Sequence, residues 1–67
     1  MKYTVYVLKS DRCLKYYTGQ TSNLSRRIEE HNRGESTYTK KYIPWVLVYS
    51  EQCGSREIAV IREKYLK

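Results

Sequence analysis

The sequence has few of the features that mark a disulfide-rich, zinc-binding or membrane-spanning protein. Only two of its 67 residues are cysteine, and Cys13 and Cys53 form neither a Cys-x-x-Cys pair nor a set with a matching histidine. We therefore expect two reduced thiols and no zinc site, because disulfides are rare in cytosolic proteins. No apolar run approaches the ~18 residues that a membrane-spanning helix requires, which predicts a protein without a membrane partner.

Signals for export and for a second domain are also missing. The first residues, Met-Lys-Tyr-Thr-Val-Tyr-Val-Leu, lack the long apolar stretch and small-residue cleavage site of a secretory signal. No repeat and no stretch rich in Gly, Ser or Pro divides the chain. We expect a cytoplasmic protein with one domain over residues 1–67, a small core and, by default, a monomeric state.

Acidic residues are outnumbered, with seven Asp and Glu against thirteen Lys and Arg, a formal charge of +6 and a pI near 9.5. Such a balance favours polyanionic partners through phosphate contacts and counterion release. DNA is the leading partner on this ground, and RNA is not excluded. Charge of this kind also serves solubility alone, so the functional argument needs a site.

Residue patterns predict an α+β fold. Residues 3–9 and 14–20 are rich in β-branched and aromatic residues and indicate a hairpin. A helix is expected from Leu24, with Ser22 or Asn23 as its N-cap and Gly34 at its end. Residues 35–43 fit either a loop or a short helix.

Two further elements complete the predicted fold. The continuous apolar run at residues 45–49 suits a strand at the centre of a sheet that is covered on two sides. After Ser55, a last helix is expected to pack through Ile58, Ile61 and Tyr65, with Ala59 and Leu66 widening that stripe. The order β-β-α-(short α)-β-α predicts a small three-stranded, largely antiparallel sheet flanked by helices.

Two tyrosines are expected to meet in the hairpin. A turn centred on residues 11 and 12 places Tyr6 directly opposite Tyr17, with Cβ atoms roughly 5 Å apart. The same register pairs Thr4 with Gly19, where the missing side chain leaves room for a substrate or marks a bulge. The alternative is an aromatic pair that only stabilises the sheet.

Charged groups on the two long helices add to this pair. Arg27 and His31 share a helical face with Leu24 and Ile28, whereas Arg26 and Glu30 are expected on the outer face. A partly buried Arg needs an anionic partner, which is either a phosphate or an internal salt bridge.

On the last helix, Glu63 lies at the border of the apolar stripe, where it either points into a cleft or forms a surface ion pair. Two phenols, a cation, an imidazole and one carboxylate together suit phosphodiester hydrolysis with one divalent cation held by oxygen. The single carboxylate argues against a two-metal nuclease.

These residues stand in a recognisable order. Residues 4–6 read Thr-Val-Tyr, residues 17–19 read Tyr-Thr-Gly, and Arg27 follows Tyr17 by ten positions on a helix with an Arg-Arg-x-x-x-His pattern. Residues 62–64, Arg-Glu-Lys, close the series. The chain thus resembles the GIY-YIG nuclease family over nearly its whole length, and specifically the small stand-alone members related to the nuclease domain of the excision-repair protein UvrC.

The resemblance implies a DNA endonuclease that uses one Mg²⁺ or Mn²⁺ ion, in repair or recombination. By position, Glu63 matches the metal ligand, Arg27 the residue that contacts the scissile phosphate, and His31 a residue that orients the proton-transfer group. Tyr6 matches the general base with Tyr17 in support, although the reverse assignment stays open. Either tyrosine would need a pKa below the usual value near 10.

The surface expected to bind nucleic acid comprises Gly19, Arg26, Lys40 and Lys41. Two other functions stay open at this point. One is a non-catalytic nucleic-acid-binding module with the same fold, and the other is a small interaction domain in which the tyrosines and Arg27 are structural.

Overall fold

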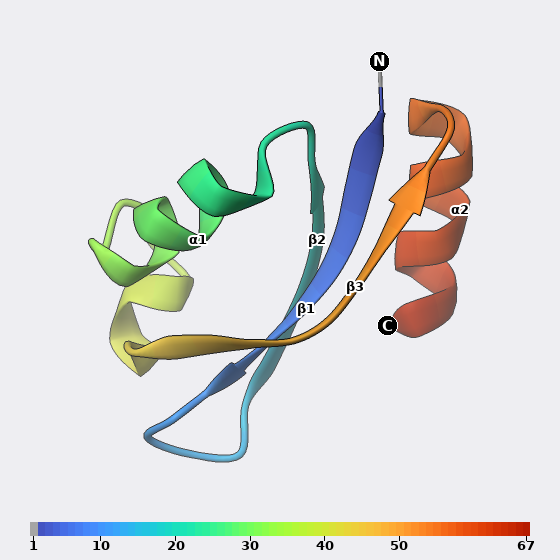
Figure 1. Ribbon diagram of the computed structural model, residues 1–67. Helices are drawn as coiled ribbons and strands as arrows, with labels where there is room; N and C mark the ends of the chain where they lie inside the picture. The colour runs from blue at the N-terminus through green and yellow to red at the C-terminus, as the bar shows by residue number, and fades with distance from the viewer. Residues whose placement is uncertain (1) are drawn as a thin grey trace.

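The computed structural model describes residues 2–67 and has three strands, two α-helices and a short 3₁₀ helix, η1 (Figure 1). The elements are, in chain order, β1 (Tyr3–Ser10), β2 (Tyr16–Thr21), α1 (Leu24–Asn32), η1 (Thr39–Tyr42), β3 (Trp45–Cys53) and α2 (Arg56–Leu66). All strand pairs are antiparallel, in the order β2-β1-β3. The predicted α+β class and element order are therefore confirmed. No helix within residues 2–67 has the length and apolar character to cross a membrane.

Side-chain caps set the ends of the two α-helices as the sequence predicts. Asn23 accepts a hydrogen bond from the backbone N–H of Arg26 at 3.2 Å, and Ser55 accepts one from that of Ile58 at 3.3 Å. Each bond satisfies a backbone donor that has no partner within its helix. Gly34 follows α1 with a φ of 80°, a conformation that glycine adopts without strain.

The sheet separates two small cores, because α1 and α2 lie on its opposite sides (Figure 1). Side chains alternate between the two faces along β1. Val5 packs with Cys53 and Ala59 under α2, whereas Tyr6 and Leu8 lie on the α1 side in a core that also holds Trp45 and Ile28. A phenol is therefore buried directly beneath α1. Both cysteines are free thiols, with Cys13 exposed and Cys53 buried.

The prediction that residues 45–49 form a buried central strand is wrong. The central strand is β1, and β3 is an edge strand in which Val46, Leu47, Val48 and Tyr49 are each 38–51% exposed. A continuous apolar run shows that a strand tolerates contact on both faces, but it carries no information about which strand has two neighbours. Helix α1 and η1 lie on one face of the sheet and α2 lies on the other, and much of β3 stays exposed.

The packed face of α2 also differs from the prediction. Ile58, Ile61 and Tyr65 are 49%, 66% and 76% exposed, so they do not form the core stripe. The helix instead packs through Ala59, which is fully buried, and Leu66. A small residue such as Ala59 lets the helix approach the sheet closely. Glu63 then lies between Ala59 and Leu66 on the packed face rather than at its border.

Candidate active site

The hairpin register differs by two residues from the predicted one. Tyr6 pairs with Gly19 and Leu8 pairs with Tyr17, because the turn is longer than two residues and closes with a 2.9 Å hydrogen bond from Ser10 N–H to the Lys15 carbonyl. A shift by two keeps every side chain on its original face. Tyr6 and Tyr17 are therefore diagonal neighbours on the α1 side of the sheet, with ring centroids 6.3 Å apart.

Tyr6, Tyr17 and His31 form one cluster, referred to below as the tyrosine–histidine cluster. His31 reaches the sheet from the packed face of α1, and its Nε2 lies 3.1 Å from the Tyr6 hydroxyl oxygen. The ring of Tyr17 lies 4.9 Å from that of His31. Tyr6 is 1% exposed and His31 is fully buried. Helix α1 and the hairpin thus bring together two phenols and an imidazole that are distant in the sequence.

Burial raises the pKa of Tyr6 to about 12, while the neighbouring Arg27 guanidinium opposes that rise. The nearby Tyr17 phenol and the Glu63 carboxylate raise the pKa of Tyr6 further, because both disfavour a second negative charge. Tyr6 is therefore a neutral phenol at physiological pH. Additional positive charge close to its oxygen is required before it can accept a proton as a phenolate.

Arg27 has an internal anionic partner. Its Nη1 lies 2.9 Å from Oε1 of Glu30, and the two side chains are 35% and 22% exposed. Glu30 consequently faces its helical neighbours and not open solvent, unlike the prediction that placed it on the outer face. The guanidinium has five N–H donors, so the ion pair with Glu30 leaves donors for Tyr6, beside which Arg27 lies, and for a phosphate.

His31 is held from both sides of its ring. Its Nδ1 lies 2.8 Å from the hydroxyl oxygen of Thr39, a fully buried residue at the start of η1. Burial lowers the pKa of His31, and the positive charge of Arg27 lowers it further. His31 is therefore a neutral imidazole at pH 7. Thr39 was not identified from the sequence, because a threonine in a segment without periodicity gives no signal of its own.

The free energy of unfolding should fall as the pH drops below about 6.5, the usual pKa of an unfolded His. The pKa of His31 is lower in the folded chain, so in this range the unfolded chain binds more protons and acid favours unfolding. Urea denaturation between pH 5 and 8 measures this slope. His31→Gln should flatten the slope, because His31 is the chain's one histidine. Wild-type stability that is constant or rises on acidification would contradict the assignment.

Gly19 has a structural role at the cluster. A Cβ atom at this position would lie 2.7 Å from the Tyr6 hydroxyl oxygen and 3.0 Å from the Tyr17 ring. Gly19 is buried, so its missing side chain makes room for the Tyr6 phenol. The open strand end that the sequence predicted at Gly19 for a nucleic acid is thus filled by Tyr6.

Gly19→Ala should destabilise the protein by about 1–3 kcal/mol, because the added methyl group displaces the Tyr6 phenol from its packed position. Urea denaturation measures the change. The matched control is Gly54→Ala, since no atom lies within 4 Å of a Cβ at Gly54 and the substitution there restricts only the unfolded chain. Equal stabilities of the two variants would show that the close approach of Tyr6 is unimportant.

Glu63 faces the same region from α2. Its carboxylate is 19% exposed and lies 2.9 Å from the Lys67 ammonium, and its charge raises the pKa of Tyr6. Residues 2–67 contain no group of three or more His, Cys, Asp or Glu side chains that could hold a metal ion. Magnesium commonly keeps several waters and takes one or two carboxylates together with substrate phosphates. A partly buried single carboxylate fits that manner of binding.

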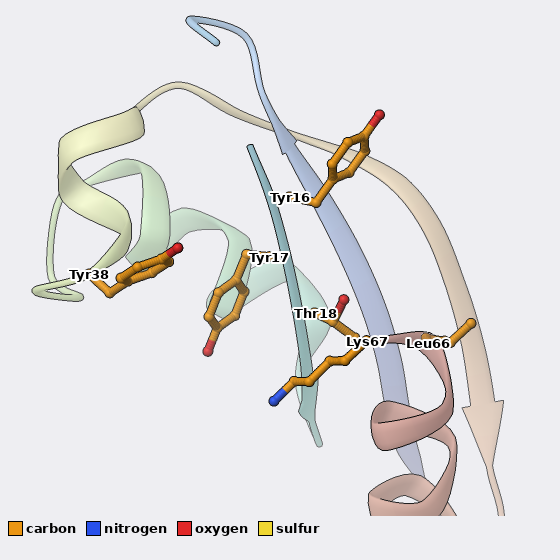
Figure 2. Close-up of a pocket in the computed structure, with 6 residues that line it drawn as sticks. All are labelled: Tyr16, Tyr17, Thr18, Tyr38, Leu66 and Lys67. Atoms are coloured by element: carbon orange, nitrogen blue, oxygen red, sulfur yellow. The ribbon is translucent and has the colours of Figure 1, made fainter. Parts of the chain in front are cut away.

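A cleft of about 400 Å³ adjoins the cluster between β2, the segment before η1 and the end of α2. It is lined by Tyr16, Tyr17, Thr18, Tyr38, Leu66 and Lys67. Figure 2 shows the Tyr17 phenol and the Lys67 ammonium directed to the same side, with Tyr38 next to Tyr17 and Tyr16 pointing elsewhere. The cleft is joined to the cluster through Tyr17 and to Glu63 through its ion pair with Lys67.

The remaining basic residues expected to bind nucleic acid lie on the surface. Arg26 is 69% exposed and lies 3.5 Å from Glu30, the partner of Arg27. Lys40 and Lys41 are exposed on η1, next to the buried Thr39. All three can contact a phosphate without rearrangement of the core.

Comparison with known proteins finds relatives that match nearly the whole of this chain. Residues 2–67 match the family described as the GIY-YIG catalytic domain. A UPF0213 protein of Staphylococcus haemolyticus is 44% identical over 68 residues, which cover 98% of this chain and 80% of that protein. A UPF0213 protein of Natronomonas pharaonis is 43% identical over 65 residues, covering 94% and 74%.

A solved structure shows a similar fold. The solution NMR structure of a UPF0213 protein from Bacillus halodurans superposes with a TM-score of 0.58 at 33% identity, covering 98% of this chain and 70% of that one. The sequence relatives and the solved structure are all UPF0213 proteins, and each match covers nearly the whole of this chain.

Proposed function

This chain belongs to the GIY-YIG family of nuclease-type catalytic domains, and on that premise we propose that it is a metal-dependent endonuclease that cleaves DNA. The observation that carries the proposal is the set of groups around the Tyr6 hydroxyl. His31 lies 3.1 Å from its oxygen, and Arg27 and Glu63 both lie near enough to change its pKa. A phosphodiester placed beside these groups would have a proton acceptor, a cation and a carboxylate within reach.

In the proposed reaction, water attacks phosphorus and the bond from phosphorus to one sugar oxygen breaks. Tyr6 would first lose its phenol proton to solvent, and as a phenolate it would accept a proton from the attacking water while the leaving sugar oxygen takes up a proton from solvent. Arg27 stabilises the phenolate and the charge that develops on the phosphate oxygens. Glu63 would hold a Mg²⁺ or Mn²⁺ ion, which supplies positive charge to the phosphate and to the nearby phenol. Tyr17 supports Tyr6, and its ring packs against His31.

The adjoining cleft gives the nucleic acid a path to the cluster. The ring centroids of Tyr17 and Tyr38 lie 6.3 Å apart, and Lys67 adds a positive charge to the lining of the cleft. Aromatic side chains that stack on bases, combined with lysines along the backbone, are the usual means of holding a nucleic acid strand. Lys40 and Lys41 on η1 would extend this basic surface through phosphate contacts.

A second candidate is a binding module that does not cleave. Two observations favour it: the pKa of Tyr6 is about 12, and the Glu63 carboxylate already has a cationic partner in Lys67. Both features would persist in a protein that holds DNA without turnover. The two functions differ in whether added metal changes the nucleic acid covalently.

The test is a panel of labelled duplex, single-stranded, nicked and branched DNA, with one RNA, that is analysed for binding and for cleavage. Binding is measured by gel shift in chelator, and cleavage is measured after addition of Mg²⁺ or Mn²⁺. If the protein is an endonuclease, we expect it to bind the nucleic acid in chelator and to cleave it after Mg²⁺ or Mn²⁺ is added. Binding with intact nucleic acid under both conditions would leave the binding module as the function.

A further inference from the structure

The Glu30 carboxylate lies between two arginines of α1. Its Oε1 lies 2.9 Å from Nη1 of Arg27, and its Oε2 lies 3.5 Å from Nε of Arg26. All three residues belong to one helix, at spacings of three and four positions that make their side chains neighbours. A negative charge here opposes the approach of a DNA phosphate, so Glu30 does not serve as a binding group for nucleic acid.

The contact with Glu30 uses one corner of the Arg27 guanidinium. Of the hydrogen bonds within residues 2–67, the one between these residues runs from Nη1. It leaves the edge formed by Nε and Nη2 for another anion. Arg62 differs, because its Nε and Nη2 both donate to Glu51, at 2.7 and 2.9 Å. Glu51 thus occupies the fork of donors that a phosphate would take, whereas Glu30 does not.

Glu30 is well placed to hold this guanidinium before substrate arrives. The Arg27 hydrogen bond lowers the pKa of Glu30, so the carboxylate is ionised at neutral pH. Both side chains are partly buried, at 22% and 35% exposed. An arginine side chain has many rotamers, and ordering it only when a ligand binds costs entropy. A carboxylate on a rigid helix orders it in advance.

We propose that Glu30 is a positioning residue that holds the Arg27 guanidinium beside Tyr6, with its free donor edge available to the scissile phosphate. The effect on cleavage rests on the proposed nuclease function, in which Arg27 contacts that phosphate. The holding of the guanidinium does not, and it can be measured in the protein without nucleic acid. If Glu30 only neutralised charge, its removal would strengthen DNA binding and would not slow cleavage.

NMR of protein labelled with ¹⁵N in arginine tests the holding directly. A guanidinium that rotates freely about its Cζ–Nε bond shows one averaged signal for its two Nη atoms, whereas a held one shows two. We expect two signals for Arg27 at low temperature, and one averaged signal in Glu30→Gln. Arg62 is the internal reference for a held guanidinium, because two of its nitrogens bind Glu51. The spectrum of Arg27→Lys assigns the Arg27 signals.

Cleavage by Glu30→Gln tests the consequence, since the amide keeps the size of the side chain and removes its charge. Single-turnover cleavage at saturating DNA should slow about tenfold, because the released guanidinium is misplaced relative to the phosphate. DNA should bind at least as tightly, because an anion near the phosphates is lost. The partly exposed pair contributes little to stability, and thermal unfolding verifies that the variant is folded.

Glu29→Gln is the matched control. Glu29 is exposed on the same helix, and its substitution makes the same change of charge. This variant should keep both Arg27 signals and the wild-type rate. An equal loss of rate in the two variants would overturn the proposal, because it would show a general effect of charge on α1.

One averaged Nη signal for Arg27 in the wild type would also overturn the proposal, and this result needs no variant. So would two separate signals in Glu30→Gln, or cleavage by that variant at or above the wild-type rate. A wild type that cleaves no nucleic acid would refute the proposed nuclease function. In that case the Arg27 signals would still show whether Glu30 holds the guanidinium.

Discussion

Arg27→Ala should slow DNA cleavage by about a hundredfold to a thousandfold, the usual cost of removing one group that stabilises developing charge. Arg27 lies beside Tyr6 at the point where the model of catalysis places the scissile phosphate. The substitution removes both the phosphate contact and the charge that lowers the pKa of Tyr6. Single-turnover cleavage of labelled DNA at saturating Mg²⁺ measures the chemical step. Arg27→Lys should recover only part of the rate, because an ammonium lacks the planar fork of donors.

The neighbouring arginine provides a matched control. Arg26 is on the same helix turn, carries the same charge and also pairs with Glu30, but its side chain is 69% exposed. Arg26→Ala should reduce DNA affinity slightly and leave the single-turnover rate within about twofold, as expected for a phosphate contact that only adds to binding. In Arg27→Ala, the loss of the partly exposed Arg27–Glu30 pair should cost little stability. Equal rates for the two variants would remove Arg27 from the active site.

Glu63→Gln should abolish the stimulation by Mg²⁺ and lower the cleavage rate by at least about a hundredfold, since a metal that neutralises charge at phosphorus contributes several kcal/mol. The amide keeps the size of the side chain but loses the negative charge that holds the ion. In the folded protein, Mn²⁺ should broaden NMR signals around residue 63, and this broadening should disappear in the variant.

Glu57→Gln, at an exposed position in the first turn of the same helix, is the control and should keep both the broadening and the rate. Glu63 is partly buried on the packed face of α2 and paired with Lys67, so thermal unfolding is measured alongside. Full activity of Glu63→Gln with Mg²⁺ would show that the ion is held elsewhere or is not used.

Local signals in the sequence predicted the order of elements correctly. Asn23 and Ser55 cap the two helices as expected, and the β-branched residues of β1 and β2 specify the hairpin. The register was wrong because Ser10 pairs with Lys15 across a longer turn, and turn length is not encoded in strand propensity. The shared face of the two tyrosines survived that error, because side-chain direction repeats every two residues.

The features that the sequence did not predict, such as which faces of β3 and α2 are buried, depend on tertiary packing. The apolar residues of β3 and the Ile58 stripe of α2 are exposed, because apolar periodicity does not identify which face meets a partner. Ala59 is the buried residue of α2, and Glu63 lies on the same, packed side of the helix with 19% of its side chain exposed. Thr39 contacts His31 only through the tertiary fold. Residue types therefore suggested the chemistry of the site, while the hydrogen bond between Thr39 and the His31 imidazole was found only in the structure.

The central claim, that this chain cleaves DNA at the Tyr6 site with a divalent cation, is tested most directly by nicking of supercoiled plasmid. Wild type and Arg27→Ala are purified identically and compared with Mg²⁺, with Mn²⁺ and in chelator, so that a contaminating nuclease would appear equally in both. We predict that the wild type nicks the plasmid only when Mg²⁺ or Mn²⁺ is present and leaves it intact in chelator. Arg27→Ala should leave the plasmid intact under all three conditions. Equal nicking by the two proteins, or intact plasmid in every sample, would contradict the claim.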